Sequence, residues 1–143
     1  MLKRKVITAI FATLLSIFLI AAWFAYADGE GLIAVLPMTV FISMVAVPAI
    51  LLYGVPVSFL SEKVTEGLSN KKRIFSSFAI HVLFGFAFIF FVGLLFDTQE
   101  LFSDFNQFWR SNEIIIFASL VTSICFWLID EGVRACSFIE RTD

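Results

Sequence analysis

The feature that most constrains the fold is an uninterrupted apolar run at residues 74–96, which follows the basic residues 71–73 and ends at Asp97. Its 23 residues exceed the ~20 that an α-helix needs to cross a hydrocarbon core of ~30 Å. His81 is the one strongly polar side chain within it. The run is too long and too aromatic for the core helix of a small water-soluble domain, so we interpret it as a membrane span.

Three further apolar runs lie at residues 6–27, 37–60 and 114–133. The chain has 143 residues, of which 60% are hydrophobic and 19 are Phe, and this is more apolar surface than one small core can bury. The sequence therefore predicts an all-α fold, in which residues 1–143 form one integral membrane domain. We expect a bundle of four transmembrane helices with the lipid bilayer covering its outer faces.

The first run has two interpretations. Basic residues 3–5, an apolar stretch and the sequence Ala25-Tyr26-Ala27 resemble a secretory signal peptide with its cleavage site. The apolar stretch is about 20 residues long, however, whereas such a signal typically has ~7–15. This length favours a retained span, and either interpretation places residue 28 outside the cell.

Prolines interrupt the second run. Pro37 suits the first turn of a helix, whereas Pro48 and Pro56 lie inside the helix and each removes a backbone hydrogen bond. We predict a kink near Pro48 and distorted geometry through residues 53–56. A broken helix of this kind is either a packing kink or part of a transport site, and neighbours or water must satisfy its freed carbonyls.

Residues 98–110 predict a short amphipathic helix between spans three and four. Its apolar residues fall on one helical face: Leu101, Phe102, Phe105, Phe108 and Trp109. Asp97 and Glu100 predict a capping box at its start. We expect this helix to lie in the outer headgroup layer, with Trp109 as an interfacial anchor; the alternative is a face that binds a partner.

The basic residues indicate how the chain is oriented. In a four-span arrangement only Arg110 falls on one side, and the others fall on the opposite side: Lys3, Arg4, Lys5, Lys63, Lys71, Lys72, Arg73, Arg134 and Arg141. Because short cytoplasmic loops carry the excess of Lys and Arg, we expect both termini in the cytoplasm. This predicts a multi-pass protein of the cell membrane.

Four polar residues reach a similar depth near the cytoplasmic side of the predicted spans, and we treat them as a candidate cluster: His81, Tyr53, Thr13 and Asp130. An ionisable residue inside a membrane is a functional-site hypothesis, and His titrates near neutral pH. The alternative for Asp130 is a solvated salt bridge with Arg134, four residues further along the helix.

A structural interpretation also exists for His81. It recurs at intervals of four with small residues, and together they form one ridge: Ser77, His81, Gly85, Ile89 and Gly93. Ridges of small residues allow membrane helices to approach closely, so Ser77, Gly85 and Gly93 are predicted helix-packing residues. A buried, hydrogen-bonded packing role for His81 is therefore the competing hypothesis.

Composition argues against several function classes. The chain has no basic block with interleaved aromatic residues, so we expect no nucleic-acid partner. One His and two Cys with no CxxC motif predict no metal site and no cofactor. Acid–base catalysis would need a partner for His81 in a core almost free of carboxylates, so we expect no enzymatic activity.

Residues 53–62 and residues 73–75, together with His81 and Gly85, resemble small uncharacterised four-span membrane proteins of Gram-positive bacilli. That group has no assigned activity, so the resemblance implies no functional residue. Our first hypothesis is a non-enzymatic accessory, regulatory or protective membrane protein that acts through helix–helix contacts with a membrane-protein partner or a second copy. The second is an oligomeric small-solute transporter or channel subunit, with His81 and the second span along the path.

Overall fold

The computed structural model describes the backbone of residues 2–29 and 31–139, and every regular element in that part of the chain is helical. Four helical segments are long and apolar enough to cross a membrane. They are α1 (Leu2–Ala27), the continuous segment α2 (Val35–Ala49), η2 (Ile50–Gly54) and α3 (Val55–Thr65), then α4 (Asn70–Phe96) and α7 (Glu113–Ile139). The predicted all-α architecture with four candidate spans is therefore confirmed.

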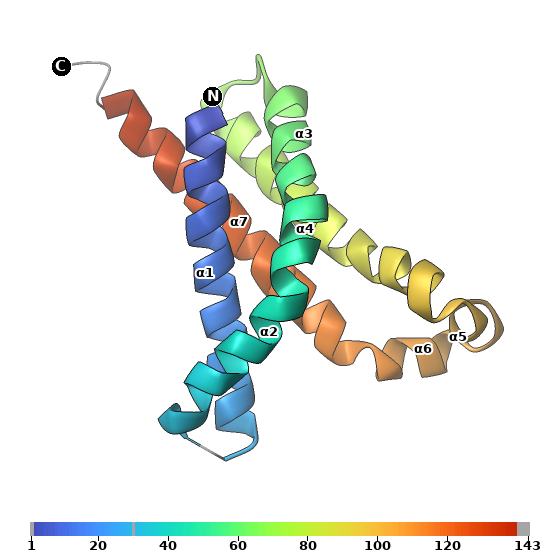
Figure 1. The fold of residues 1–143 in the computed structure, drawn as a ribbon. Coiled ribbons are helices and arrows are strands. Elements are labelled where there is room, and N and C mark those ends of the chain that lie inside the picture. Colours follow the sequence, from blue (N-terminus) through green and yellow to red (C-terminus); the bar gives the residue numbers. More distant parts are fainter. Residues whose placement is uncertain (1, 30, 140–143) are drawn as a thin grey trace.

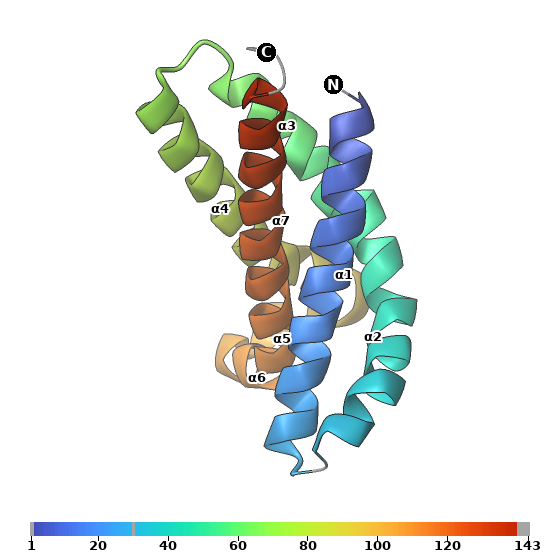
Figure 2. The ribbon, with the colours of Figure 1, turned by 90° about the vertical axis from the view of Figure 1, so that its left-hand side faces the viewer.

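The four segments form an open bundle. Helix α7 packs against both α1 and α4, while α2 packs against α1 and α3 packs against α4. The start of α1, the α3–α4 turn and the last turns of α7 lie at one end, which is the top of Figures 1 and 2. We call it the basic end, because it carries Lys3, Arg4, Lys5, Lys63, Lys71, Lys72, Arg73 and Arg134. Arg141 lies outside the described residues.

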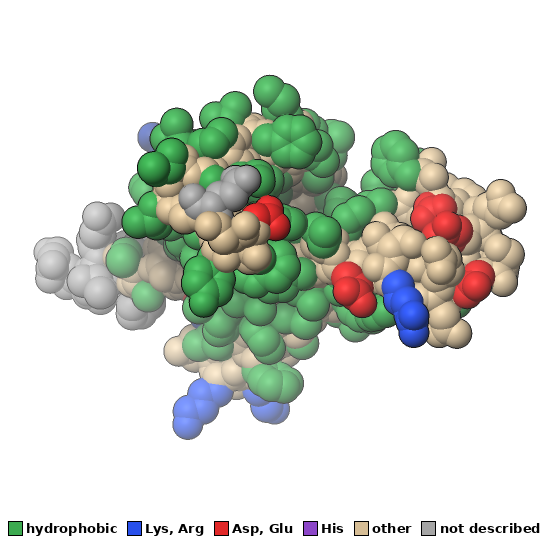
Figure 3. Space-filling view, turned by 90° about the horizontal axis from the view of Figure 1, so that it is seen from below, with side chains coloured by type: hydrophobic (Ala, Val, Ile, Leu, Met, Phe, Trp, Pro, Cys, Tyr) green, Lys and Arg blue, Asp and Glu red, His purple; other side chains and the backbone are tan. Residues whose placement is uncertain are grey.

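The opposite end, which we call the acidic end, holds the α1–α2 turn with the short 3₁₀ helix η1 (Leu32–Ala34), and the connection between α4 and α7. Gly29 and Gly31 adopt φ of 71° and 72° in the turn, a conformation that favours glycine. Figure 3 views this end, where acidic side chains gather around the α5–α6 connection. Among the described residues, the acidic ones at this end are Asp28, Asp97, Glu100, Asp104 and Glu113.

The second span is helical throughout but contains a π-helical segment. Pro56 has no backbone N–H, and just before it the N–H of Val55 donates to the carbonyl of Ile50, five residues back. Helix α2 continues through Pro48, and the segment changes direction between α3 and α2 (Figure 1). The distortion predicted at residues 53–56 thus takes the form of a π segment that begins at Ile50.

Helices α4 and α7 cross closely. The buried residues of α4 are Ser77, His81, Gly85, Ile89 and Gly93, which is the ridge described above. A Cβ atom built on Gly85 would lie 2.8 Å from the Cβ of Ser123 and would also meet the Ser123 hydroxyl. The small residue at position 85 therefore allows the two backbones to approach.

The connection between α4 and α7 differs from the prediction. It contains two helices, α5 (Thr98–Ser103) and α6 (Phe105–Ser111), so the single helix predicted over residues 98–110 is wrong. The break lies at Asp104, because its carboxylate accepts a hydrogen bond of 3.0 Å from the N–H of Gln107 and starts a new helix there.

The capping box predicted at Asp97 and Glu100 is also wrong. The Asp97 side chain makes no capping hydrogen bond to α5, whose N-cap residue it is. Asp97 instead ends α4, where its backbone N–H donates to the carbonyl of Gly93 at 2.9 Å. With φ of −144° and ψ of 40°, one residue serves as the end of α4 and the start of α5.

Aromatic side chains pack the α4–α7 connection onto the bundle. Phe108 is fully buried against Ile89 and Ile116, and a Cβ atom built on Gly93 would lie 2.7 Å from two atoms of its ring. Trp109, the predicted interfacial anchor, is half-buried and contacts the ring of Phe86 with a centroid separation of 5.6 Å. This cluster fixes α6 against α4 and α7.

The acidic-end halves of α2 and α4 diverge (Figure 1). Only 11% of an apolar 18-residue stretch within Leu32–Thr65 is buried inside the protein. The corresponding share in the Lys3–Ala27 span is 33%. Large apolar side chains of α2 are therefore exposed: Leu36, Val40, Phe41, Met44 and Val45. On α4 the same holds for Phe91, Leu94, Leu95 and Phe96.

Candidate functional site

Most of the buried polar residues of the described chain lie toward the basic end. All four spans contribute, and eight side chains belong to this layer: Lys5, Thr8, Ser58, Ser61, Thr65, Ser77, His81 and Asp130. Buried polar groups in a membrane protein need partners, because lipid offers them no hydrogen bonds. Their partners therefore define the candidate site.

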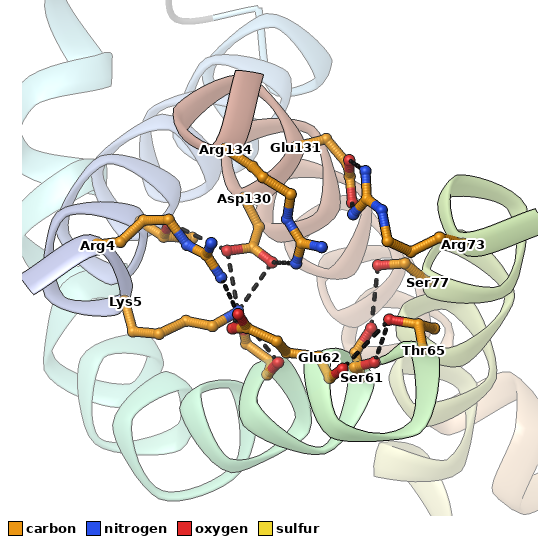
Figure 4. Close-up of polar contacts among 12 residues, drawn as sticks. Arg4, Lys5, Ser61, Glu62, Thr65, Arg73, Ser77, Asp130, Glu131 and Arg134 are labelled. Atoms are coloured by element: carbon orange, nitrogen blue, oxygen red, sulfur yellow. Dashed lines mark hydrogen bonds and ion pairs between the residues drawn. The ribbon is translucent and has the colours of Figure 1, made fainter. Parts of the chain in front are cut away.

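Lys5 of α1 lies at the centre of this layer, with only 3% of its surface exposed. Its Nζ atom is 2.9 and 2.8 Å from the two carboxylate oxygens of Asp130 on α7. On α3, the hydroxyl and carbonyl oxygens of Ser58 lie 2.8 and 3.2 Å from Nζ, and Oε2 of Glu62 lies at 3.1 Å. One ammonium group thus joins three helices (Figure 4).

Two arginines flank Lys5. Arg4 forms an ion pair with Oε1 of Glu62, and Arg134 lies 3.7 Å from Oδ2 of Asp130. The Thr8 hydroxyl, one turn along α1 from Lys5, is 3.4 Å from Oδ1 of Asp130. We call Arg4, Lys5, Glu62, Asp130 and Arg134 the charged cluster; Figure 4 shows their side chains converging from α1, α3 and α7.

Helix α4 joins the same end through separate contacts. Arg73 makes a bidentate ion pair with Glu131 of α7, with both N···O distances 2.8 Å. The hydroxyls of Ser61 on α3 and Ser77 on α4 are 3.0 Å apart. Since Arg73 and Glu131 are each 16% exposed, solvent screens this pair more than it screens Lys5 and Asp130.

His81 is buried beside this layer, with 2% of its surface exposed. Its Nδ1 atom lies 2.9 Å from the carbonyl oxygen of Ser77. A carbonyl can only accept, so Nδ1 carries the proton and, in the neutral ring, Nε2 is an acceptor. Among the described residues, Nε2 is buried and has no hydrogen-bond partner.

The four residues of the predicted cluster have different polar partners. The Tyr53 hydroxyl donates to the carbonyl of Phe84 at 2.8 Å, and His81 bonds within its own helix. Thr13 lines an apolar cleft between α1 and α2. Asp130 binds Lys5, so within the described chain no hydrogen bond joins any two of the four.

The solvated salt bridge predicted for Asp130 and Arg134 is wrong in its environment. The two side chains do pair, but Asp130 is only 1% exposed, and Lys5 is closer than Arg134. The reason is the close packing of α1 along α7, which brings a lysine from a distant part of the sequence onto the carboxylate.

The residue that the sequence prediction missed is Lys5. It was assigned to the basic start of the chain, yet it lies three residues before Thr8 and seven before Ala12, on one helical face with them. Thr8 and Ala12 are both fully buried. A lysine in phase with a buried face was therefore the available signal for a buried cation.

The candidate site consists of polar and charged contacts between helices. Among residues 3–29 and 31–136, whose side chains are described, no group of three or more His, Cys, Asp and Glu could hold a metal ion. The cleft between α1 and α2 is lined almost entirely by apolar side chains. What the site offers is a dense set of charge-assisted hydrogen bonds between helices.

Comparison of the chain with known protein families, characterised proteins and solved structures finds no match. The resemblance to small four-span proteins of bacilli therefore stays a prediction.

Proposed function

We propose that the protein is a non-enzymatic multi-pass membrane protein that acts as an accessory, regulatory or protective factor through contacts with another membrane helix. The observation that carries this proposal is the unequal burial of the spans. In the Leu32–Thr65 span, 11% of an apolar 18-residue stretch is buried inside the protein, and the acidic-end half of this span diverges from α4. We therefore assign α2 as the contact surface for the partner.

The charged cluster supports this assignment by fixing the other end of the bundle. Lys5, Glu62 and Asp130 join α1, α3 and α7, and the Arg73–Glu131 pair joins α4 to α7. Ion pairs of this kind in a low-dielectric site have defined geometry. With the basic ends fixed in this way, the acidic-end faces of α2 and α4 stay open to a neighbour.

For the cellular setting, we place the protein in the cell membrane with the basic end in the cytoplasm. Eight basic residues of the described chain lie at that end, and Arg110 lies at the acidic end. This asymmetry is the one that the positive-inside rule describes. Reporter fusions at the two termini should give the same cytoplasmic signal, and signals from opposite sides would contradict the placement.

Site-specific photo-crosslinking in native membranes tests the contact surface. A photoreactive phenylalanine analogue at Phe41 of α2, which is 69% exposed, should give one dominant protein adduct. The matched control is Phe11 of α1, which is also a phenylalanine on a span and is 57% exposed. The same adducts from both positions, or lipid adducts alone from Phe41, would contradict the proposal.

A second candidate function is an oligomeric small-solute transporter or channel subunit. The observation that favours it is the unpartnered Nε2 of His81 in a buried polar layer. This candidate predicts that His81→Ala abolishes solute flux in proteoliposomes while the protein still folds. Unchanged flux, or no flux from the wild-type protein, would remove it.

A further inference from the structure

We propose that the oxygen atoms of Ser58, Glu62 and Asp130 form a binding site for a monovalent cation, and that the Lys5 ammonium occupies this site as a tethered cation. The ligand class is a primary alkylammonium or an alkali metal ion. This inference goes beyond the proposed function and does not depend on it, because it concerns the basic end and not the exposed face of α2.

The number of oxygen atoms around Lys5 is the first argument. Five oxygens lie within 3.2 Å of Nζ, namely two from Asp130, two from Ser58 and one from Glu62. An ammonium group has three N–H donors, so the site offers more acceptors than those donors can use one by one. Carboxylate, carbonyl and hydroxyl oxygens around one point are the ligands of a hard cation.

The second observation is that the oxygens and the cation come from different helices. All five oxygens come from α3 and α7, whereas the cation comes from α1. The carboxylate of Glu62 presents Oε2 to Lys5 and Oε1 to Arg4, so it keeps a partner when Lys5 is removed. Asp130 likewise keeps Thr8 and Arg134.

Burial is the third argument. Ser58 and Asp130 are 2% and 1% exposed, so water does not compete strongly for their oxygens. Removal of Lys5 takes away the closer cation of Asp130, because Arg134 lies at 3.7 Å, and loss of one partner of a buried ion pair is destabilising. Lys5→Ala removes the three carbons and the ammonium beyond Cβ. The space that it leaves has the size of propylammonium.

The test uses the full-length chain with Lys5→Ala, purified in detergent and unfolded by heat. Propylammonium, Na⁺ and K⁺ are compared at constant ionic strength with tetramethylammonium, which has no N–H donor and is too large for the site. We expect propylammonium or an alkali cation in large excess to raise the unfolding midpoint by about 5 °C, as binding to the folded state alone requires. Tetramethylammonium should cause no rise.

Three variants serve as controls. Lys3→Ala removes an exposed lysine two residues earlier and should show no response to any cation. Lys5→Met fills the space with a neutral side chain and should also show none. Lys5→Ala combined with Asp130→Asn removes one of the two carboxylates of the site, the more deeply buried one, and should lose the response.

Each result of this test either supports or overturns the proposed cation site. A rise with propylammonium alone identifies an amine site, and a rise with Na⁺ or K⁺ identifies an inorganic cation site; both support the proposal. An equal response to tetramethylammonium, or no response, overturns it. So does a Lys5→Ala protein that fails to fold even when propylammonium is present throughout synthesis and purification, because the free amine should then replace the missing side chain.

Discussion

The two ends of the bundle are held together by different interactions. At the basic end, charged and hydroxyl side chains join all four spans, with Lys5 and Asp130 almost completely buried. At the acidic end, ring packing fixes α6 onto α4 and α7, around the fully buried Phe108. Helix α2 packs on α1 at that end, but its outer face is exposed, with Phe41 and Met44 about 70% exposed.

The choice of helix neighbours depends on the basic end. Lipid is as apolar as a Leu or Phe side chain, so apolar faces alone do not decide which helix packs on which. A buried ion pair does, since separation of α1 from α7 would take Lys5, its closest cation, away from Asp130. The basic end therefore sets the helix neighbours, and the outer face of α2 at the acidic end stays open to a further contact.

The largest effect is expected from Lys5→Ala. It leaves the buried Asp130 carboxylate without its closest cation, and removal of one member of a buried pair destabilises a protein by about 3–5 kcal/mol. Reversible unfolding in mixed micelles, followed by Trp fluorescence, measures the change. Lys3→Ala should change the free energy of unfolding by less than about 0.5 kcal/mol. Equal effects of the two variants would contradict the buried position of Lys5.

A somewhat smaller loss should follow Phe108→Ala at the other end. The change opens a cavity against Ile89, Ile116 and Gly93, so we expect a loss of about 3 kcal/mol in the free energy of unfolding. The control is Phe102→Ala in α5, because Phe102 is 76% exposed. If Phe102→Ala proved the more harmful variant, the described packing of α6 would be incorrect.

Two glycine substitutions should act in opposite directions. Gly85→Ala places a Cβ against Ser123 and should destabilise the protein by about 1–2 kcal/mol. Gly132→Ala on α7 meets no atom within 4 Å, and it should stabilise the protein by up to about 1 kcal/mol through helix propensity. Thermal unfolding of both variants in the same detergent checks the signs, and a stabilising Gly85→Ala would exclude the close crossing.

The smallest effect is expected from the Arg73–Glu131 pair at the basic end, which is more exposed to solvent than Lys5 and Asp130. Glu131→Gln weakens the bidentate contact with Arg73, and pairs reached by solvent contribute about 1 kcal/mol or less. The loss should shrink further in high salt, whereas the effect of Lys5→Ala should persist because its pair is buried. A Glu131→Gln effect as large as that of Lys5→Ala would remove the distinction between the two pairs.

Hydrophobic runs and spacing were sufficient to predict the four spans, because a helix that crosses lipid must be apolar over a fixed length. The break at Asp104 was not predicted, since a capping carboxylate within an amphipathic pattern does not disturb that pattern. The Asp97 capping box failed for a related reason: one residue both ends α4 and begins α5. Local signals of this kind depend on which neighbouring helix uses the residue.

The candidate site was harder to predict than the fold. Asp130 was recognised as a polar residue within the membrane layer, but its partner Lys5 is 125 residues away in sequence. Depth within a span leaves the azimuth of a residue around its helix undetermined. The Tyr53 hydroxyl therefore donates to the carbonyl of Phe84, and Thr13 lines the cleft between α1 and α2. The phase of Lys5 with Thr8 and Ala12 would have supplied that azimuth for α1.

The most direct test of this account is a double-mutant cycle between Lys5→Met and Asp130→Asn, measured by reversible unfolding in one detergent. Each single variant should lose several kcal/mol, whereas the double variant should lose much less than their sum, with a coupling free energy of about 3 kcal/mol. Two losses that simply add would contradict a buried ion pair that joins α1 to α7.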